Sequence, residues 1–246
     1  MNLWLTPAPL RFEAVPQTDT LILAVMRLVF YMPVPILFAL LLNEIRNLRY
    51  KKLIQTVTYL PHFLSWVVIA GIFRNLLSPI NGIVNYLIGL FGREPVAFLV
   101  KSEYFRQIII ISSIWAQTGW GSIVILAAII GIEPELYDAC SVDGGGRWAK
   151  LRWITFPGIM PVVLMMYILR IGRLLRSGFD QVINFYNPAV YNVGDIMNTY
   201  VFRVGLRQFD YSYATALGLF ANLISFALLL LSNWGVRKID PESSLW

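Results

Sequence analysis

The chain has 246 residues, of which 57% are hydrophobic and only 14% are charged, and its mean hydropathy is +0.63. This composition is too apolar for an ordinary soluble domain and indicates a protein that crosses a membrane several times. The net charge of +6 does not favour nucleic-acid binding, because the basic residues are divided among short intervals between apolar stretches. We therefore expect the chain to contact membrane lipid and no nucleic acid.

Five apolar stretches reach the roughly 20 residues that a helix needs to cross the hydrocarbon core. They predict an all-α, multispanning membrane helical bundle with spans at about 21–42, 54–76, 108–132, 154–172 and 213–236. The second span is the weakest, because Tyr59, Pro61 and His62 interrupt its first half. Residues 1–20 are expected to form an irregular external segment, and residues 237–246 a tail on the opposite side.

The distribution of lysine and arginine predicts the orientation. Nine Lys or Arg occur in the 42 residues of three intervals that lie on one side of the membrane: 43–53, 133–153 and 237–246. The intervals on the opposite side carry six in 87 residues. The positive-inside rule therefore places 133–153 and the C-terminal tail in the cytoplasm, and five spans then leave the N-terminus outside. On the outer side, residues 78–106 have helical apolar spacing and few charges, which favours an amphipathic helix along the interface.

The interval 133–153 is a polar loop with helix signals on both sides. Pro134 suits the first turn of a helix, and acidic residues near it favour the positive end of the helix dipole. The glycines 144–146 then predict a break, since glycine tolerates positive φ. A second short helix is expected over 147–154, so the loop is predicted to be a helix-turn-helix outside the bilayer.

Six residues of this loop have a spacing that resembles the EAA loop of ABC-importer permease subunits, which have the MetI-like fold: Asp138, Ala139, Cys140, Gly144, Ile154 and Pro157. Asp138, Cys140 and Phe156 depart mildly from the usual Glu, Ala and Leu. The resemblance implies a coupling helix that sits in a cleft of a cytoplasmic ATP-binding-cassette ATPase. That partner would bind ATP-Mg, so we expect no cofactor in this chain and a transport subunit rather than an enzyme. One more helix usually precedes the region that matches from Thr20 onward in this family, so we expect either that the first helix is missing here or that the start of the chain has been assigned too late.

A second resemblance covers the outer loop and last helix. It is to the carbohydrate branch of these permeases, the polysaccharide-type group labelled LplB, and it rests on NPAVYNVGDIMNTYVFRVGL and FDYSYATALGLF. With YLPHFLSWVVIAGIF and the EAA-like loop, it extends over roughly Thr20 to Trp246, and Arg173 and Arg176 depart from it. It implies an oligosaccharide cargo, an extracellular solute-binding lipoprotein, a second permease subunit in a heterodimer, and a multi-pass location in a bacterial plasma membrane.

Ionisable side chains inside spans are costly and are therefore candidates for function. Arg27 lies within the first span, and a candidate substrate path lies at and beyond the outer end of the fourth span: Arg170, Arg173, Asp180, Gln181, Asn184 and Tyr186. Two structural alternatives stay open. An arginine can snorkel, with its stem buried and its head at the interface. A polar loop can also pack against a partner subunit without touching cargo, which is the favoured interpretation for any single loop residue.

The sequence does not support enzyme chemistry. A single histidine, His62, excludes an HExxH metal site, and a single cysteine, Cys140, excludes an internal disulfide and a cysteine-pair metal site. The stretch DGGGRW lacks the Lys-Ser or Lys-Thr of a phosphate loop. His62 beside Pro61 is predicted to be a helix-end feature rather than a proton relay.

Two rival functions remain. One is an ion-coupled secondary transporter, which the lack of Asp and Glu in the predicted spans disfavours. The other is a non-transporting membrane assembly factor, in which the structured loop would have no purpose.

Overall fold

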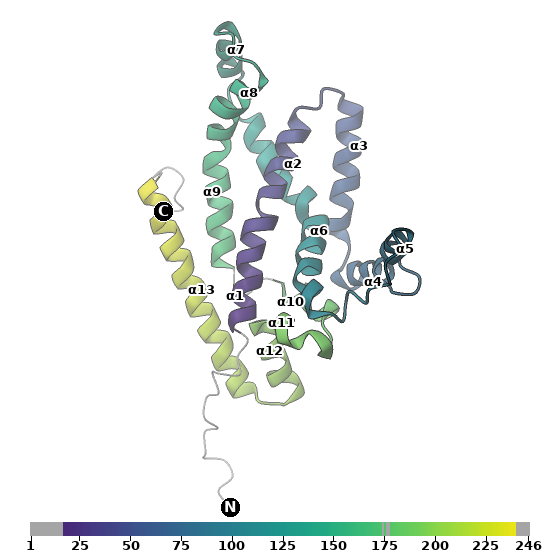
Figure 1. The fold of residues 1–246 in the computed structure, drawn as a ribbon. Helices are drawn as coiled ribbons and strands as arrows, with labels where there is room; N and C mark the ends of the chain where they lie inside the picture. Colours follow the sequence, from purple (N-terminus) through teal and green to yellow (C-terminus); the bar gives the residue numbers. More distant parts are fainter. Residues whose placement is uncertain (1–16, 174, 176–177, 240–246) are drawn as a thin grey trace, which may run out of the picture.

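The computed structural model describes residues 17–173, 175 and 178–239 of the chain. Within these ranges all regular structure is helical, which confirms the all-α fold class (Figure 1). Short 3-10 and π-helical turns join several of the α-helices. The α-helices are α1 Gln17–Met26, α2 Pro33–Asn43, α3 Leu48–Tyr59, α4 Trp66–Leu76, α5 Ile83–Leu90, α6 Ser102–Ile130, α7 Pro134–Val142, α8 Arg147–Lys150, α9 Phe156–Gly172, α10 Phe179–Phe185, α11 Tyr191–Gly194, α12 Met197–Phe202 and α13 Tyr211–Ile239.

Four helical segments are long and apolar enough to cross a membrane, and each lies over one of the predicted spans: Thr18–Asn43, Ser102–Ile130, Arg147–Gly172 and Tyr211–Lys238. The first of these joins α1 and α2 through the π-helical turn Arg27–Tyr31. The region predicted as the second and weakest span, 54–76, lies in a bent pair, in which Leu48–Phe63 and Trp66–Leu76 meet at 106°. The described part of the chain has four continuous spans, and a fifth only if the bent pair counts as one.

Local backbone chemistry explains the bend. Pro61 lies in the 3-10 turn Leu60–Phe63, where its missing N–H removes one helical hydrogen bond. Leu64 is extended, with φ −82° and ψ 140°. Ser65 then caps α4, because its side chain accepts a hydrogen bond from the Val68 N–H at 3.4 Å. One helix therefore ends and another begins within two residues.

The ends of the bundle differ from the predicted boundaries. Residues 17–20, predicted to be irregular, already belong to α1, and residues 237–239, assigned to the tail, form the last turn of α13. The rest of both predicted end segments, 1–16 and 240–246, lies outside the described residues.

The second short helix predicted over 147–154 is not a separate element. α8, the π-helical turn Leu151–Thr155 and α9 run on as one helix. In the turn, the Phe156 N–H bonds to the Leu151 carbonyl oxygen, and Pro157 follows directly. A π-helical turn widens the backbone locally, which accommodates a proline that would otherwise break the regular hydrogen-bond ladder.

Helix α6 is the central element of the bundle. In its most apolar stretch 61% of the residues are buried, against 17% in the spans of α9 and α13. One core cluster joins α6 to α1 and α10 through Leu23, Phe105 and Val182. A second cluster joins α6 to α2 and α9 and contains Ile125 and Ile159. The outer surfaces of α9 and α13 are left for lipid or other subunits.

The two ends of the bundle carry different elements (Figure 1). α7, the connection between α2 and α3, and the last turns of α13 lie towards one end. The beginning of α1 and helices α10 to α12 lie towards the other. The intervals rich in lysine and arginine therefore lie towards the same end, an arrangement that the predicted orientation requires.

Helices α3 and α6 cross at a glycine. A Cβ atom added at Gly119 would collide with the backbone carbonyl of Thr58, and His62 stacks nearby on Trp120 with ring centroids 4.5 Å apart. Small residues permit this close approach of two membrane helices. The crossing fixes the first half of the bent pair against α6.

We predict that Gly119→Ala lowers the thermal unfolding midpoint of the purified protein. The methyl group would push α3 away from α6, and overpacking of this kind costs about 1–3 kcal/mol. Gly218→Ala in α13 is the matched control, because an added Cβ there has no neighbour within 4 Å. Equal midpoints for both variants would contradict the close crossing.

Candidate functional site

A cavity of about 500 Å³ lies between the first span, α6, α9 and α10. Four residues of the predicted substrate path line it, and Arg27 joins them: Arg170, Arg173, Asp180 and Gln181. Its volume is in the range of small-ligand sites. Arg176, which was expected to continue the arginine face of α9, lies outside the described residues.

Gln181 joins the helices that form one wall of this cavity. Its Oε1 accepts hydrogen bonds from Arg27 Nη2 at 2.7 Å and Ser113 Oγ at 2.9 Å. Its Nε2 donates to the Ile109 carbonyl oxygen at 2.7 Å and to Ser112 Oγ at 2.8 Å. Because these four bonds use the full capacity of the amide, Gln181 can be 2% exposed without a desolvation penalty. The side chain thereby connects α10 to both α6 and the first span.

The π-helical turn Arg27–Tyr31 brings two side chains to the same cavity. Arg27 and Tyr31 are both buried and both line it. The guanidinium carbon of Arg170 lies 4.2 Å from the centre of the Tyr31 ring, which is a cation–π contact between two spans. π-helical turns inside helices often occur at functional sites, and here the turn lies where two arginines from different helices converge.

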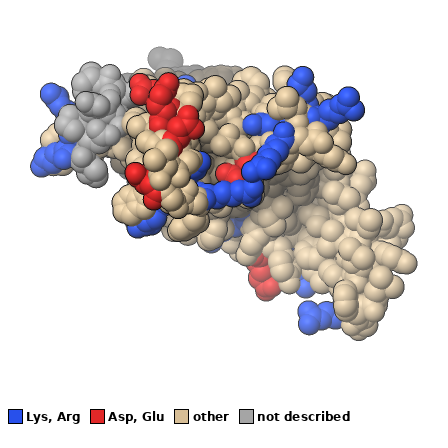
Figure 2. All heavy atoms as spheres, turned by 90° about the horizontal axis from the view of Figure 1, so that it is seen from above, with Lys and Arg blue, Asp and Glu red and all other residues tan. Residues whose placement is uncertain are grey.

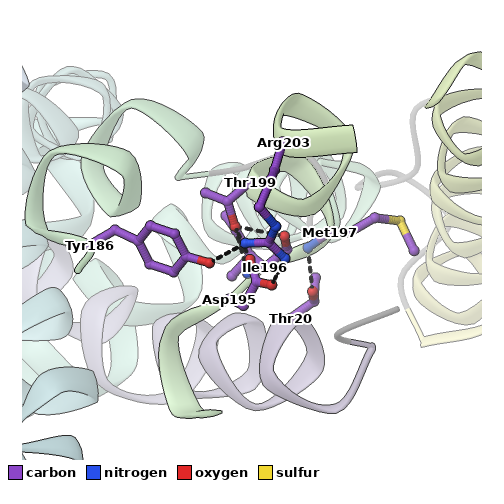
Figure 3. A network of polar contacts seen from close by, with 7 residues as sticks. All are labelled: Thr20, Tyr186, Asp195, Ile196, Met197, Thr199 and Arg203. Atoms are coloured by element: carbon purple, nitrogen blue, oxygen red, sulfur yellow. Dashed lines mark hydrogen bonds and ion pairs between the residues drawn. The ribbon is translucent and has the colours of Figure 1, made fainter. Parts of the chain in front are cut away.

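The other two predicted path residues hold the outer loop instead of lining the cavity. The Asn184 side-chain amide donates to the backbone carbonyl oxygen of Asp180 at 2.7 Å, and the backbone carbonyl oxygen of Asn184 accepts a hydrogen bond from Arg74. Tyr186 points towards Arg203 (Figure 3). Residues that are close in sequence therefore have different roles: Asp180 and Gln181 line the cavity, and Tyr186 belongs to a separate hydrogen-bond network.

That network is centred on an ion pair between Arg203 and Asp195 with an N–O distance of 2.5 Å. Arg203 also donates to the Tyr186 hydroxyl at 2.7 Å, and the Thr199 hydroxyl donates to Asp195 at 2.7 Å (Figure 3). Burial raises the pKa of the Tyr186 hydroxyl, and the hydrogen bond and charge of Asp195 raise it further against the opposing effect of Arg203. The hydroxyl therefore stays protonated at neutral pH and accepts from Arg203. The Thr20 hydroxyl accepts from the Met197 N–H at 2.9 Å and ties the network to α1.

The EAA-like loop projects from the opposite end of the molecule (Figure 1). Within it, Asp138 and Ala139 are exposed on α7, Cys140 and Ile154 are half-buried, and Pro157 is exposed. Gly144 has φ +78°, so the break after α7 does need a glycine. Figure 2, which looks onto this end, shows acidic side chains gathered over the loop with basic side chains beside them. The charged residues of the loop are Glu133, Glu135, Asp138, Asp143, Arg147, Lys150 and Arg152.

A hydrogen bond joins the two halves of the loop. The Tyr137 hydroxyl on α7 lies 3.0 Å from the Thr155 hydroxyl in the π-helical turn, and Thr155 is buried. This contact connects the exposed helix α7 to the helix that continues into the membrane. Neither residue belongs to the EAA-like spacing.

Several cavity residues were not predicted. Ser113 and Gln117 line the cavity from α6, and Trp66 does so from the first turn of α4. The sequence did contain a signal for Ser113 and Gln117, because a polar side chain in the middle of a membrane span usually faces the protein interior and forms a hydrogen bond there. The position of Trp66 depends on the bend after Phe63, which sequence periodicity does not specify.

We predict that Asp195→Asn loosens the outer loop. The substitution keeps the shape of the side chain but leaves the half-buried Arg203 without its carboxylate, at a cost of about 1–3 kcal/mol. Residues 178–210 should become more sensitive to protease, whereas Glu94→Gln on an exposed loop should not change the cleavage rate. If Asp195→Asn and Arg203→Met, alone and combined, left the cleavage rate at the wild-type value, the network would have no stabilising role.

Comparison with known proteins identifies the family. Residues 14–244 match the family described as "Binding-protein-dependent transport system inner membrane component". In Bacillus subtilis (strain 168), the polygalacturonan/rhamnogalacturonan transport system permease protein YteP and the protein LplB are each 41% identical to this chain over 224 residues, or 91% of this chain and 70% of either relative.

A solved structure agrees with the sequence comparison. The crystal structure of a bacterial alginate ABC transporter, in complex with its alginate pentasaccharide-bound periplasmic protein, includes a chain that is 41% identical to this one. The two superpose with a TM-score of 0.88 over 91% of this chain and 77% of that chain. The expected resemblance and the multi-pass location in the plasma membrane are both confirmed. The chain belongs to the family of inner membrane components of binding-protein-dependent transport systems.

Proposed function

We propose that this chain is the permease subunit of an ATP-driven importer and forms the path of a carbohydrate, an oligosaccharide, across the membrane. In this proposal a cytoplasmic ATP-binding-cassette ATPase binds ATP-Mg and supplies the energy. A second permease subunit of different sequence completes the path, and an extracellular solute-binding lipoprotein delivers the cargo. Two relatives support the carbohydrate cargo, because YteP belongs to a polygalacturonan/rhamnogalacturonan transport system and the solved relative belongs to an alginate transporter.

One observation carries the coupling part of the proposal. The EAA-like loop presents an exposed helix, α7, at the end of the bundle (Figure 1). Residues 143–146, with the left-handed Gly144, link it to the helix that continues into a span, and the hydrogen bond between Tyr137 and Thr155 joins the two helices directly. Closure of the ATPase would press on α7, and these two connections would carry the displacement along α9 to the cavity. Such a change shifts the balance between outward- and inward-facing states.

The cavity has the chemistry that a saccharide requires. Sugars combine hydroxyl groups with apolar ring faces, and they are bound by hydrogen-bonding side chains together with aromatic rings. The cavity offers both kinds of group, with Trp66 as a ring and Gln117 as a polar side chain. Gln181 and Ser113 also line it, but they are already hydrogen-bonded to each other. These features support the assignment of the cavity to the cargo path.

The position of acidic residues disfavours the secondary transporter. In the four continuous spans, as far as the structure describes them, the acidic residues are Asp19 and Glu103. Both lie in the first turn of a helix, and Asp19 is paired with Arg106 at 2.6 Å. An ion-coupled transporter needs an acidic group deep within a span, where protonation or a cation can change its charge.

Crosslinking tests the coupling assignment directly. In a Cys140→Ser background, Ala139→Cys should crosslink to the copurified ATPase in membranes, with a yield that depends on nucleotide. Ser212→Cys, exposed near the start of α13 at the other end of the bundle, is the control and should not react with the ATPase. If the ATPase copurifies but position 139 gives no crosslink, α7 is not the coupling helix.

We also predict that Gly144→Val uncouples ATP hydrolysis from uptake. Valine at φ +78° is strained by about 1–2 kcal/mol, which is roughly a tenfold change in the population of the native turn. Uptake should fall by about that factor relative to ATP hydrolysis. Gly146→Ala is the control, because Gly146 has an ordinary φ of −78° and open space around it. Unchanged transport in Gly144→Val would remove the coupling assignment.

A further inference from the structure

The cavity has an excess of positive charge. Its charged lining residues, among those the structure describes, are Arg27, Arg170, Arg173 and Asp180. Three guanidinium groups thus face one carboxylate in a space between membrane helices. A cationic group within a span is costly, by about 2.5–3.5 kcal/mol on insertion scales, and is retained where it serves a function.

Arg27 is a buried arginine that is held in place by Gln181. It is 5% exposed, and Gln181 fixes its guanidinium group at 2.7 Å. The backbone of Gly178, with φ +92°, comes so close that a Cβ atom at this position would collide with the guanidinium nitrogens. The charge of Arg27 is therefore held at the cavity wall in one place.

Arg170 and Arg173 differ from Arg27. No described carboxylate lies within 4.0 Å of either guanidinium group, since the two ion pairs in the described chain are Arg106 with Asp19 and Arg203 with Asp195. The Arg170 guanidinium group lies over the Tyr31 ring. It carries five N–H donors in a planar fork, and such a fork matches the two oxygens of a carboxylate.

We propose that this cavity binds the carboxylate of an acidic saccharide, with Arg170 as the main contact and Arg173 as a second. The inference rests on the proposed carbohydrate path and specifies its substrate class. Arg27 contributes a fixed positive charge behind the site. A carboxylate that enters would reduce the mutual repulsion of the arginines, whereas a neutral sugar would leave it unchanged. The Trp66 ring would pack against the sugar ring of an acidic or a neutral saccharide.

The test uses the purified membrane complex of both permeases and the ATPase. The binding protein is omitted, so that its own specificity does not contribute. Isothermal titration would compare trigalacturonate and trimannuronate with their methyl esters, which keep the backbone and remove the charge, and with maltotriose. The acids should bind at least about tenfold more tightly than their esters, and this preference should shrink as salt increases.

Variants assign the preference to the arginines. Arg170→Gln should remove most of the preference for acid over ester, and Arg170→Lys should retain part of it, because a single charge without the planar fork remains. Arg173→Gln provides a second test at an exposed side chain that is not needed for packing. Arg93→Gln is the matched control on an exposed outer loop away from the cavity lining, and it should keep the wild-type ratio.

The outcomes separate the two proposals. Equal binding of acids and esters, or equal weakening of both by Arg170→Gln and Arg173→Gln, would overturn the carboxylate site and leave the carbohydrate path standing. Binding of maltotriose without binding of the acids would likewise overturn the carboxylate site and leave the carbohydrate path standing. If none of the saccharides binds to the assembled complex, the carbohydrate path itself fails and the carboxylate site with it.

Discussion

The structure depends on one fully bonded amide. Gln181 joins α10, α6 and the first span, which are far apart in the sequence, and it does so within a bundle that has little water to satisfy polar groups. A buried amide that lost any of its partners would be destabilising, so the protein requires all four bonds at once. Through Gln181, Arg27 has a hydrogen-bond partner, and α10 is held against α6 and the first span as one wall of the cavity. Arg170 lines the same cavity from α9, so it shares this space with the positive charge of Arg27, which the bond to Gln181 holds in place.

Much of the fold follows from elementary sequence signals. Apolar length located the four continuous spans, and Pro134 with the glycines 144–146 located α7 and its end. These features are local, because helix starts, helix ends and membrane length are set by a few adjacent residues. The same local signals did not predict the bend within 54–76. There the apolar content fits a span, but Pro61 and the Ser65 cap divide it into two helices whose mutual angle is decided by packing on α6.

The candidate site was predictable only in part, for a reason that the outer loop illustrates. Asp180, Gln181, Asn184 and Tyr186 lie within seven residues of one another in sequence, yet the first two line the cavity and the last two face other partners. A short helix such as α10 distributes neighbouring side chains around its axis, so proximity in sequence does not give a common direction. The polar partners on α6, Ser112 and Ser113, could be recognised as unusual in a span. Their bond to Gln181 is a tertiary contact that no single stretch contains.

The continuous helix from α8 to α9 has a mechanical consequence. The segment Arg147–Gly172 contains 26 residues, and at 1.5 Å per residue it is a rod about 39 Å long. Arg147 stands at one tip, next to the glycine break, and Arg170 stands near the other tip, at the cavity. A tilt of such a rod by about 5° changes the lateral offset between its tips by about 3 Å, which is comparable to the length of a hydrogen bond. A small rotation at the tip next to the glycine break is therefore enough to make or break a contact of Arg170, without any rearrangement inside the span.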